Sequence, residues 1–557
     1  MSRLDDAVAS RLAGWTDERV ADRLWGKDGS LWAASGKPAD EVAAWLGWLD
    51  LPEVMSGRAA ELEHVARDVR EDGYRRAAVL GMGGSSLAPE LFSRLFGRSV
   101  EGGLELRILD STHPDAVRGF RSWASEQRTL FIVSSKSGST TEPNAYQAAM
   151  SEIAPALDFV AITDPGTQLA DLARAQEFRA IVEAPPDVGG RYSALTVFGL
   201  VPAALVGVDL PGLLERARRM ADACRNPDAA ANPGLALGAE LGEAAVAGRD
   251  KLTILTSPRL APFGDWAEQL IAESTGKAGT GIVPVVGEAP AEAAAYPEDR
   301  YFVVLTIAGD PDPSLERLAG ELEAAAHPVR RIELADSLDV GAEFMRWEVA
   351  TAAAGIVLGI DPFDQPNVQE SKDATKALLE AYRSRGDLPQ PMPIVSDADI
   401  AASADPQVLG DAPVSVDGAV RQLISLARGG RDYVGILAYL PPDPDVAERL
   451  QAIRTRIRDA TGAATTLGFG PRFLHSTGQL HKGGPDTGVF LQLTAEPSKD
   501  LPIPGWEESF GTLIASQALG DLAALQKRGR RALRLHFRDV HAGLDRLEAM
   551  VGAALSV

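Results

Sequence analysis

The sequence has little cysteine and no long apolar run. Cys224 is the one cysteine among 557 residues, so no intramolecular disulfide can form, which fits a reducing compartment. The longest apolar run, residues 349–360, is shorter than the roughly 20 residues that cross a bilayer. The chain starts with charged residues and lacks the apolar core of a signal peptide. We therefore predict a cytoplasmic protein with no membrane segment.

The chain also lacks an excess of positive charge. Its formal net charge is −23, which disfavours a nucleic-acid or anionic-membrane partner. An anionic small substrate is not excluded, because a local site can be positive on an acidic protein. A chain of 557 residues is too long for one core, so we expect two or more domains.

Two α/β patterns follow a helical segment at residues 1–60. In each, short apolar runs alternate with helix-length segments, which predicts a mainly parallel sheet between helices. The runs of the first pattern span 77–80, 104–109, 130–133, 159–163 and 178–182, and those of the second span 252–256, 301–307, 433–440, 488–494 and 533–537. We predict an α/β fold with three-layer αβα domains at 61–235 and 236–557, and ligands at the carboxyl ends of the strands.

A hydroxyl-rich loop follows the third apolar run, within the segment TLFIVSSKSGSTTE at residues 129–142. Six hydroxyl side chains surround Lys136, and a helix with Pro143 in its first turn follows. Hydroxyls, free backbone N–H groups, the helix dipole and one ammonium together make a site for a phosphate dianion. A Ser/Thr-rich surface turn is the alternative interpretation.

Two glycine-rich segments are candidates for contact with the same ligand, GMGGSS at residues 81–86 and GGRYS at residues 189–193. Glycines let backbone N–H groups approach a phosphate or a sugar closely. The first segment is neither a dinucleotide fingerprint nor a Walker loop, and a tight structural turn also explains it. In the second, the guanidinium of Arg191 suits a developing oxyanion, whereas a surface salt bridge is the alternative.

Two polar segments supply candidate proton-transfer and sugar-binding groups. Glu273 stands at a helix end, where a glutamate in a partly dry pocket can act as a general base and a solvated helix end is the alternative. Gln365 and Lys372, seven residues apart, can share a helix face toward a ring or hydroxyl oxygen, although a capped amphipathic helix explains this spacing equally well. Glu370 lies between them, and we expect it at the helix surface or behind the site.

Histidine is scarce as well, and two of the seven histidines lie in the polar segment LHSTGQLHKGG at residues 474–484. A histidine titrates near neutrality and suits proton transfer to oxygen, which makes His475 and His481 candidates. The chain has no HExxH motif and no cysteine pair, so we expect no metal site.

The six segments GMGGSS, SSKSGSTTE, GGRYS, EQLIAESTGK, FDQPNVQESK and HSTGQ together resemble those of the glucose-6-phosphate isomerase family. The resemblance is closest to the isomerase half of bacterial transaldolase–isomerase fusions and covers the chain from about residue 75. It implies two sugar isomerase (SIS) domains, a homodimer, and no metal or nucleotide cofactor. It also implies interconversion of glucose 6-phosphate and fructose 6-phosphate, in glycolysis and gluconeogenesis. The chain has no room for a transaldolase barrel, and a link to a separate transaldolase is left open.

The resemblance also implies roles for single residues. The residues that would bind substrate are Gly84, Ser85, Ser135, Lys136, Ser137, Thr140, Gly190, Gln269 and Gln365. Glu273 matches the base that moves a proton between carbons 1 and 2 through a cis-enediol, and Arg191 would stabilise the enediolate. His475 matches the ring-opening histidine, which in the family comes from the partner subunit. Lys372 would lie with Gln365 near the ring oxygen and the phosphate side.

The order of the segments departs from the family's. The family usually runs base, histidine, then glutamine–lysine pair, whereas here Gln365 and Lys372 precede His475. Two other functions stay open: an isomerase of another sugar phosphate, such as mannose 6-phosphate, and a non-catalytic SIS module that senses sugar phosphates. A sensor needs the phosphate loop but not the set of Glu273, Arg191 and His475.

Overall fold

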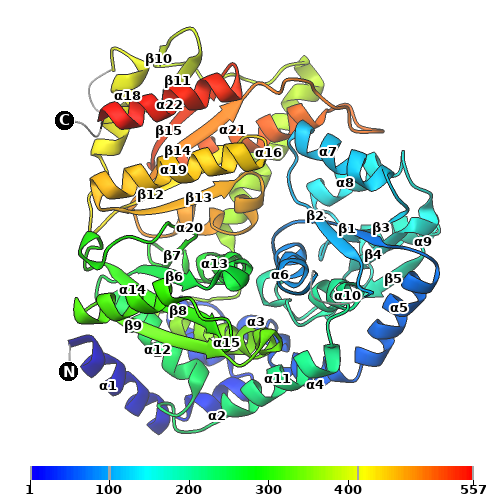
Figure 1. The fold of residues 1–557 in the computed structure, drawn as a ribbon, viewed down its shortest axis with the longest axis vertical. Coiled ribbons are helices and arrows are strands. Elements are labelled where there is room, and N and C mark those ends of the chain that lie inside the picture. The colour runs from blue at the N-terminus through cyan, green and yellow to red at the C-terminus, as the bar shows by residue number, and fades with distance from the viewer. Residues whose placement is uncertain (1–2, 98–101, 410–412, 555–557) are drawn as a thin grey trace.

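The computed structural model describes residues 3–97, 102–409 and 413–554. It contains three sheets, and each sheet with its covering helices forms one unit (Figure 1). In Figure 1 the first unit lies at the right in blue and cyan, the second at the lower left in green, and the third at the upper left in yellow to red. No helix of these described residues is long and apolar enough to cross a membrane.

Short helices form the start of the chain, as expected. They are α1 (Arg3–Asp17), α2 (Val20–Trp25), η1 (Gly29–Ser35), α3 (Ala39–Ala43), η2 (Gly47–Asp50) and α4 (Leu51–Ser56), where η marks a 3-10 helix. Their tryptophans belong to the main apolar core, in which Trp32 and Trp48 pack around Phe363. The N-terminal segment therefore supports the domains rather than forming one of its own.

The first unit is a five-stranded parallel sheet in the order β2-β1-β3-β4-β5. Its strands are β1 (Arg76–Gly81), β2 (Glu105–Leu109), β3 (Thr129–Ser134), β4 (Phe159–Thr163) and β5 (Ala180–Glu183). Its helices are α5 (Ala59–Glu71), η3 (Gly83–Ser85), α6 (Leu87–Phe96), α7 (Pro114–Ser125), α8 (Thr141–Met150), η4 (Ala156–Asp158), α9 (Gln168–Ala175), η5 (Gly190–Tyr192) and α10 (Val197–Val206). Each predicted apolar run overlaps one strand, and the central strand β3 is buried along its whole length.

The second unit is a four-stranded parallel sheet in the order β7-β6-β8-β9. Its strands are β6 (Lys251–Thr256), β7 (Val283–Val286), β8 (Arg300–Ile307) and β9 (Val329–Leu334). The helices around it are α11 (Leu210–Ala223), α12 (Pro233–Val246), η6 (Pro258–Leu260), α13 (Ala261–Thr275), η7 (Ala293–Ala295), α14 (Pro313–Ala324), η8 (Ser337–Asp339) and α15 (Val340–Leu358). β7 contains Pro284, which an edge strand tolerates because one of its sides needs no ladder hydrogen bonds.

The third unit is a six-stranded sheet in the order β10-β11-β15-β14-β12-β13, reached through the long helix α16 (Pro366–Arg385). Its strands are β10 (Val395–Ser396), β11 (Ile400–Ala404), β12 (Tyr433–Tyr439), β13 (Ala464–Phe469), β14 (Gly488–Ala495) and β15 (Arg531–Phe537), of which β10 and β11 are antiparallel to their neighbours. Its helices are α17 (Pro406–Leu409), α18 (Val416–Ser425), α19 (Pro444–Thr461), η9 (Arg472–His475), α20 (Gly478–Gly483), α21 (Phe510–Lys527) and α22 (Val540–Ala554).

The third sheet departs from the expected second domain at 236–557. Two predicted runs, 252–256 and 301–307, are β6 and β8, whereas 433–440, 488–494 and 533–537 belong to another sheet. Short buried strands and helices alternate in both units, so the pattern alone does not show where one sheet ends and the next begins. The α/β class, with mainly parallel sheets flanked by helices, is confirmed.

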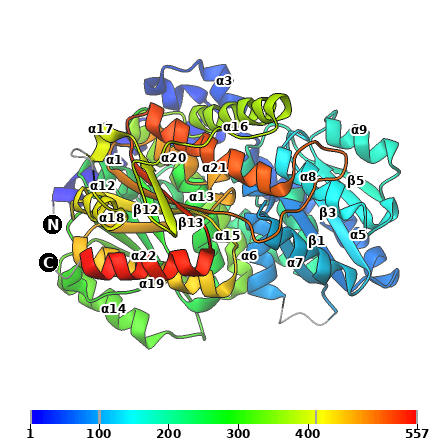
Figure 2. The ribbon, with the colours of Figure 1, turned by 90° about the horizontal axis from the view of Figure 1, so that it is seen from above.

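Helices α16 and α21 connect the third unit to the first. Both pack against the first unit's core, to which they contribute Leu379 from α16 and Phe510 and Leu513 from α21. The ring of Phe510 stacks on Tyr146 of α8 with centroids 6.3 Å apart. Figure 2 shows α21 reaching from the third unit toward α8. The same two helices carry residues of the site below.

Candidate active site

The glycine-rich segments meet at the carboxyl edge of the first sheet. There β1 has β2 on one side and β3 on the other, the topology at which ligands bind in such sheets. A Cβ at Gly84 would lie 1.9 Å from the carbonyl oxygen of Gly190, so the two segments touch. A Cβ at Gly83 would lie 2.9 Å from both Gln269 Nε2 and the carbonyl oxygen of His475. Both glycines are therefore required by the close approach of the other segments.

The hydroxyl-rich loop lies between β3 and α8. Ser135 Oγ donates a hydrogen bond to Thr140 Oγ1 at 3.1 Å, and Ser137 Oγ lies 3.4 Å from the same atom. The ammonium of Lys136 is paired with the carboxylate of Asp164. The loop thus presents clustered hydroxyls at the start of a helix, while Lys136 would have to exchange Asp164 for a phosphate in order to bind it.

Arg191, Gln269, Glu273 and Gln365 form a connected set that we call the base group. Arg191 is only 3% exposed, and its Nη1 lies 3.4 Å from Glu273 Oε1 and donates to Gln365 Oε1 at 2.9 Å. Gln269 Nε2 donates to Glu273 Oε2 at 3.1 Å. Gln269 Oε1 is buried and has no partner among the described residues, so it can accept a hydrogen bond from a substrate hydroxyl.

Lys277 holds the loop that leads into α16. Its ammonium donates to Asp361 O at 2.7 Å and to Asp364 Oδ1 at 2.8 Å. Arg191 Nη2 donates to two carbonyl oxygens of the same loop, those of Pro362 at 2.6 Å and Asp364 at 3.1 Å. Burial, reinforced by the charge of Arg191, lowers the pKa of Lys277 to about 8 against the opposing charge of Asp364. Two buried cations therefore fix this loop.

Thr112, Glu142, His475 and Gln517 form a second set that we call the histidine group. His475 Nε2 lies 3.2 Å from Glu142 Oε1, and Gln517 Nε2 donates to the same oxygen at 2.6 Å. Thr112 Oγ1 donates to Gln517 Oε1 at 2.7 Å. Burial would raise the pKa of Glu142, but the charge and hydrogen bond of His475, with Lys372 further off, outweigh it and lower this pKa below 4.5.

The two groups join at the backbone of His475. This residue ends η9 in the third unit, and its carbonyl oxygen accepts a hydrogen bond from Gln269 Nε2 at 2.8 Å. The chain itself therefore brings a histidine to the site, in spite of the altered order of the segments.

Gln479 joins three of the segments quoted above. Its Nε2 donates to Gly276 O at 2.9 Å and to Asn367 Oδ1 at 2.7 Å, and its Oε1 accepts from Asn367 N at 2.8 Å. A Cβ at Gly483 would lie 2.3 Å from Asn367 Oδ1, so a glycine is needed there as well. The ESTGK, FDQPN and HSTGQ segments are thus held together by one buried amide.

A cavity of about 600 Å³ opens beside the histidine group, within the usual range for small-ligand pockets of roughly 300–1,000 Å³. The predicted site residues that line it are Ser137, Thr140, Lys372 and His475. Nine predicted site residues do not line it: Gly84, Ser85, Ser135, Lys136, Gly190, Arg191, Gln269, Glu273 and Gln365. The base group among them is connected to the cavity wall through the hydrogen bond from Gln269 to the backbone of His475. Hydroxyls, an ammonium and an imidazole therefore face one cavity.

Two residues considered in the sequence analysis, His481 and Glu370, lie outside the candidate site. His481 is buried against the rings of Tyr433 and Phe490, and burial lowers its pKa well below the ordinary value. Glu370 is paired with Arg528 at the surface of α16, as expected. Neither side chain lines the cavity.

Some residues of the site were not predicted as such. Glu142 ends the SSKSGSTTE segment and Lys277 ends the EQLIAESTGK segment. Their places in these two segments are therefore a sequence signal for both residues. Gln517 lies in the middle of α21, where one glutamine on a largely apolar helix that also carries Gln526 gives no local signal. Only the packing of α21 against the first unit reveals it.

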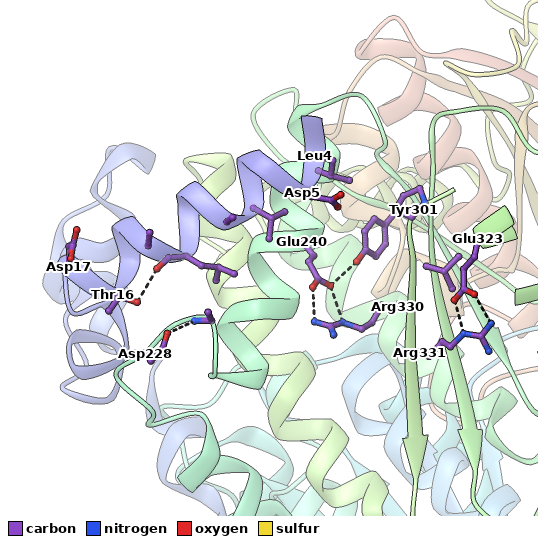
Figure 3. A pocket seen from close by; sticks show the side chains of 17 residues that line it. Leu4, Asp5, Thr16, Asp17, Asp228, Glu240, Tyr301, Glu323, Arg330 and Arg331 are labelled. Atoms are coloured by element: carbon purple, nitrogen blue, oxygen red, sulfur yellow. Dashed lines mark hydrogen bonds and ion pairs between the residues drawn. The ribbon is translucent and has the colours of Figure 1, made fainter. Parts of the chain in front are cut away.

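A larger cavity, of about 930 Å³, lies elsewhere, between α1 and the β9 edge of the second sheet (Figure 3). Four of its charged side chains form ion pairs: Glu240 binds Arg330, and also the hydroxyl of Tyr301, and Glu323 binds Arg331. None of the predicted site residues lines it. Its size alone does not mark it as the reactive site.

The chain is similar in sequence to curated enzymes. It is 28% identical over 398 residues to the glucose-6-phosphate isomerase of Carboxydothermus hydrogenoformans, covering 60% of this chain and 85% of that protein. It is 29% identical over 386 residues to the glucose-6-phosphate isomerase of Rubrobacter xylanophilus, covering 60% of this chain and 89% of that protein. No family model matches the chain.

The resemblance to the glucose-6-phosphate isomerases is confirmed. A solved structure, the glucose-6-phosphate isomerase of Chlamydia trachomatis, superposes with a TM-score of 0.52 at 19% identity, covering 67% of this chain and 86% of that one. At this identity the structural likeness supports the fold alone.

Proposed function

We propose that this chain is a glucose-6-phosphate isomerase, an aldose–ketose isomerase that interconverts glucose 6-phosphate and fructose 6-phosphate. One observation carries the proposal: the hydroxyl-rich loop, Lys372 and His475 face one cavity, and Gln269 links His475 to Glu273. Relatives of that name over 85% and 89% of their length support the reaction class.

The residues divide the reaction into ring opening and proton transfer. The substrate phosphate would bind the hydroxyls of Ser135, Ser137 and Thr140 at the N-terminus of α8. His475, oriented by Glu142, would give a proton to the ring oxygen while the bond from that oxygen to carbon 1 breaks. The hydroxyl on carbon 1 loses its proton to water in the same step, which leaves the aldehyde. The open-chain aldose then lies beside the base group.

In the second step Glu273 would take the proton from carbon 2, which leaves a cis-enediolate with its charge on the carbon 1 oxygen. Glu273 would return the proton to carbon 1 while the proton of the carbon 2 hydroxyl moves to the carbon 1 oxygen, which gives the ketose through the cis-enediol. Arg191 would offset the negative charge on the enediolate oxygen, and a positioned donor of this kind contributes about 3 kcal/mol. Gln269 Oε1, unpartnered among the described residues, would accept a hydrogen bond from a sugar hydroxyl. No step requires a metal or a nucleotide.

Assembly and location are part of the same proposal. A homodimer follows from the family resemblance, although in this chain one subunit already holds both the base and histidine groups. The buried single cysteine, Cys224, suits a cytoplasmic location. A functional link to a separate transaldolase is testable by co-purification of the two proteins.

The test is the conversion of fructose 6-phosphate to glucose 6-phosphate by the purified chain, with and without EDTA. We expect turnover that EDTA leaves unchanged, and slower turnover of mannose 6-phosphate. Binding of sugar phosphates without turnover would replace the proposal by a sensor, and preferred turnover of mannose 6-phosphate would change the substrate.

A further inference from the structure

A second polar cavity, of about 250 Å³, lies at the carboxyl edge of the third sheet. In this sheet β12 has β13 on one side and β14 on the other, the same arrangement that places the active site on the first sheet. Its wall includes Tyr439 from β12, Thr494 from β14, Arg534 and His536 from β15, and Ile514 and Ala518 from α21.

Strand alternation puts the polar side chains of this edge on one face. Leu533 and Leu535 of β15 belong to the apolar core on the far face, so Arg534 and His536 point to the opposite face. The register pairs Arg534 with Gln492 and His536 with Thr494 on the neighbouring strand. Four polar residues thus stand side by side where most of the sheet is apolar.

Arg534 is a buried cation without an ion-pair partner among the described residues, although the charge of Glu496 acts on it from further off. It is 7% exposed, and its Nη2 lies 3.2 Å from His536 Nδ1. Among the described residues its guanidinium forms no ion pair, and its Nε has no hydrogen-bond partner. Arg531 on the same strand, by contrast, binds Asp432 at 3.0 Å. A buried guanidinium with five donors is costly unless an anion or several acceptors satisfy it.

The nearby carboxylates do not fill this role. Glu496 is 71% exposed and faces His536 Nε2 at 3.4 Å. The carboxylate of Asp500 accepts hydrogen bonds from the backbone N–H groups of Leu501 at 2.7 Å and Gly511 at 2.8 Å. Neither carboxylate therefore forms an ion pair with Arg534, which lines the cavity.

We propose that this cavity binds a small molecule through one carboxylate or phosphate group, which the guanidinium of Arg534 holds. The planar fork of arginine donates two parallel hydrogen bonds to either group. The cavity is smaller than the usual ligand pocket of roughly 300–1,000 Å³, so the molecule is small.

This site is distinct from the active site but shares two of its walls. Gln517 of α21 lines the active-site cavity, whereas Ile514 and Ala518 on the same helix line this one. On α16, Lys372 faces the first cavity and Tyr382 faces the second. The inference does not depend on the proposed isomerase activity, since it concerns binding alone.

The test uses inorganic phosphate and succinate as probes, measured by calorimetry and by the shift in melting temperature. The full chain carries Ser135→Ala and Lys136→Ala, which weakens phosphate binding at the active site. We expect one probe or both to bind saturably, with binding lost in the added variant Arg534→Met. The control Arg531→Met removes an arginine from the same strand and should leave the binding unchanged.

The two probes distinguish a ligand that carries a phosphate from one that carries a carboxylate. Binding of phosphate alone points to a phosphorylated ligand, and binding of succinate alone to a carboxylic acid. Arg534→Gln repeats the test with a neutral polar side chain, should the Met variant lack a cooperative unfolding transition. Saturable binding that persists without Arg534, or no binding of either probe, would overturn the proposal.

Discussion

The base group and the histidine group both contain a buried carboxylate, but the partners of the two carboxylates differ. Glu273 lies 3.4 Å from the guanidinium of Arg191, whereas Glu142 lies 3.2 Å from the imidazole of His475. The base group joins the first two units, and the histidine group joins the first to the third. A guanidinium suits the residue that stabilises a charged intermediate, and an imidazole suits proton transfer.

The largest expected effect is on the base group. Glu273→Gln should lower kcat on the order of 10³-fold, because a general base typically contributes about 10²–10⁴-fold, and substrate affinity should change little. Steady-state assays with fructose 6-phosphate measure this. The matched control is Glu370→Gln, which removes a nearby carboxylate bound to Arg528 at the surface. Equal losses of kcat in the two variants would show that Glu273 is not the base.

The next effect separates the histidine group from the base group. His475→Ala should lower kcat for the cyclic substrate about 10²-fold but spare an open-chain analogue, because only ring opening needs this proton. His541→Ala, at an exposed histidine, is the control. If the open-chain analogue loses as much activity as the cyclic substrate, His475 has no special role in ring opening.

A smaller effect concerns the loop that both buried cations hold. Lys277→Met should lower the free energy of unfolding by about 2 kcal/mol and kcat/KM about tenfold, since buried carbonyls lose a charged donor. Denaturant unfolding and kinetics measure the two losses. Lys37→Met removes a 44% exposed lysine that lies 3.6 Å from the same Asp364, and it should have almost no effect. If both variants lose similar amounts of stability and kcat/KM, the ion pair with Asp364 is what matters, and not the hydrogen bonds of Lys277 to the buried loop.

The smallest effect is on the pH dependence of stability. The pKa of Glu142 is below 4.5 in the folded state, so the unfolded chain takes up this proton first as the pH falls. The stability that this carboxylate supplies is complete above 4.5 and is lost as the pH falls below that value. Glu142→Gln should therefore cost about 1–3 kcal/mol at neutral pH, and less in acid.

Unfolding free energies across the acid range measure this difference. The control is Glu152→Gln, at a 52% exposed glutamate paired with Arg121. Its unfolding free energy should differ little from that of the wild type at every pH. If the difference in unfolding free energy between Glu142→Gln and the wild type grows as the pH falls, the pKa of Glu142 is not lowered in the folded state.

Local patterns pointed to the segments that meet at the candidate site, but they did not show how the strands divide among the sheets. Ser135, Arg191 and Glu273 each stand in a short segment whose residue types suggest their chemistry, so these three could be proposed from the sequence. β7 contains a proline and β10 has two residues, which hides both from a search for apolar runs. The role of Gln517 depends on packing between helices far apart in sequence, which no local pattern carries.

The most direct test of the account is whether one chain supplies both groups. Chains carrying Glu273→Gln and chains carrying His475→Ala are co-expressed and purified together, and conversion of fructose 6-phosphate is compared with each variant alone and with the wild type. The account predicts an active wild type and a mixture no more active than the better of the two variants. Activity restored in the mixture would mean that His475 acts in a neighbouring subunit, and would contradict a site complete within one chain.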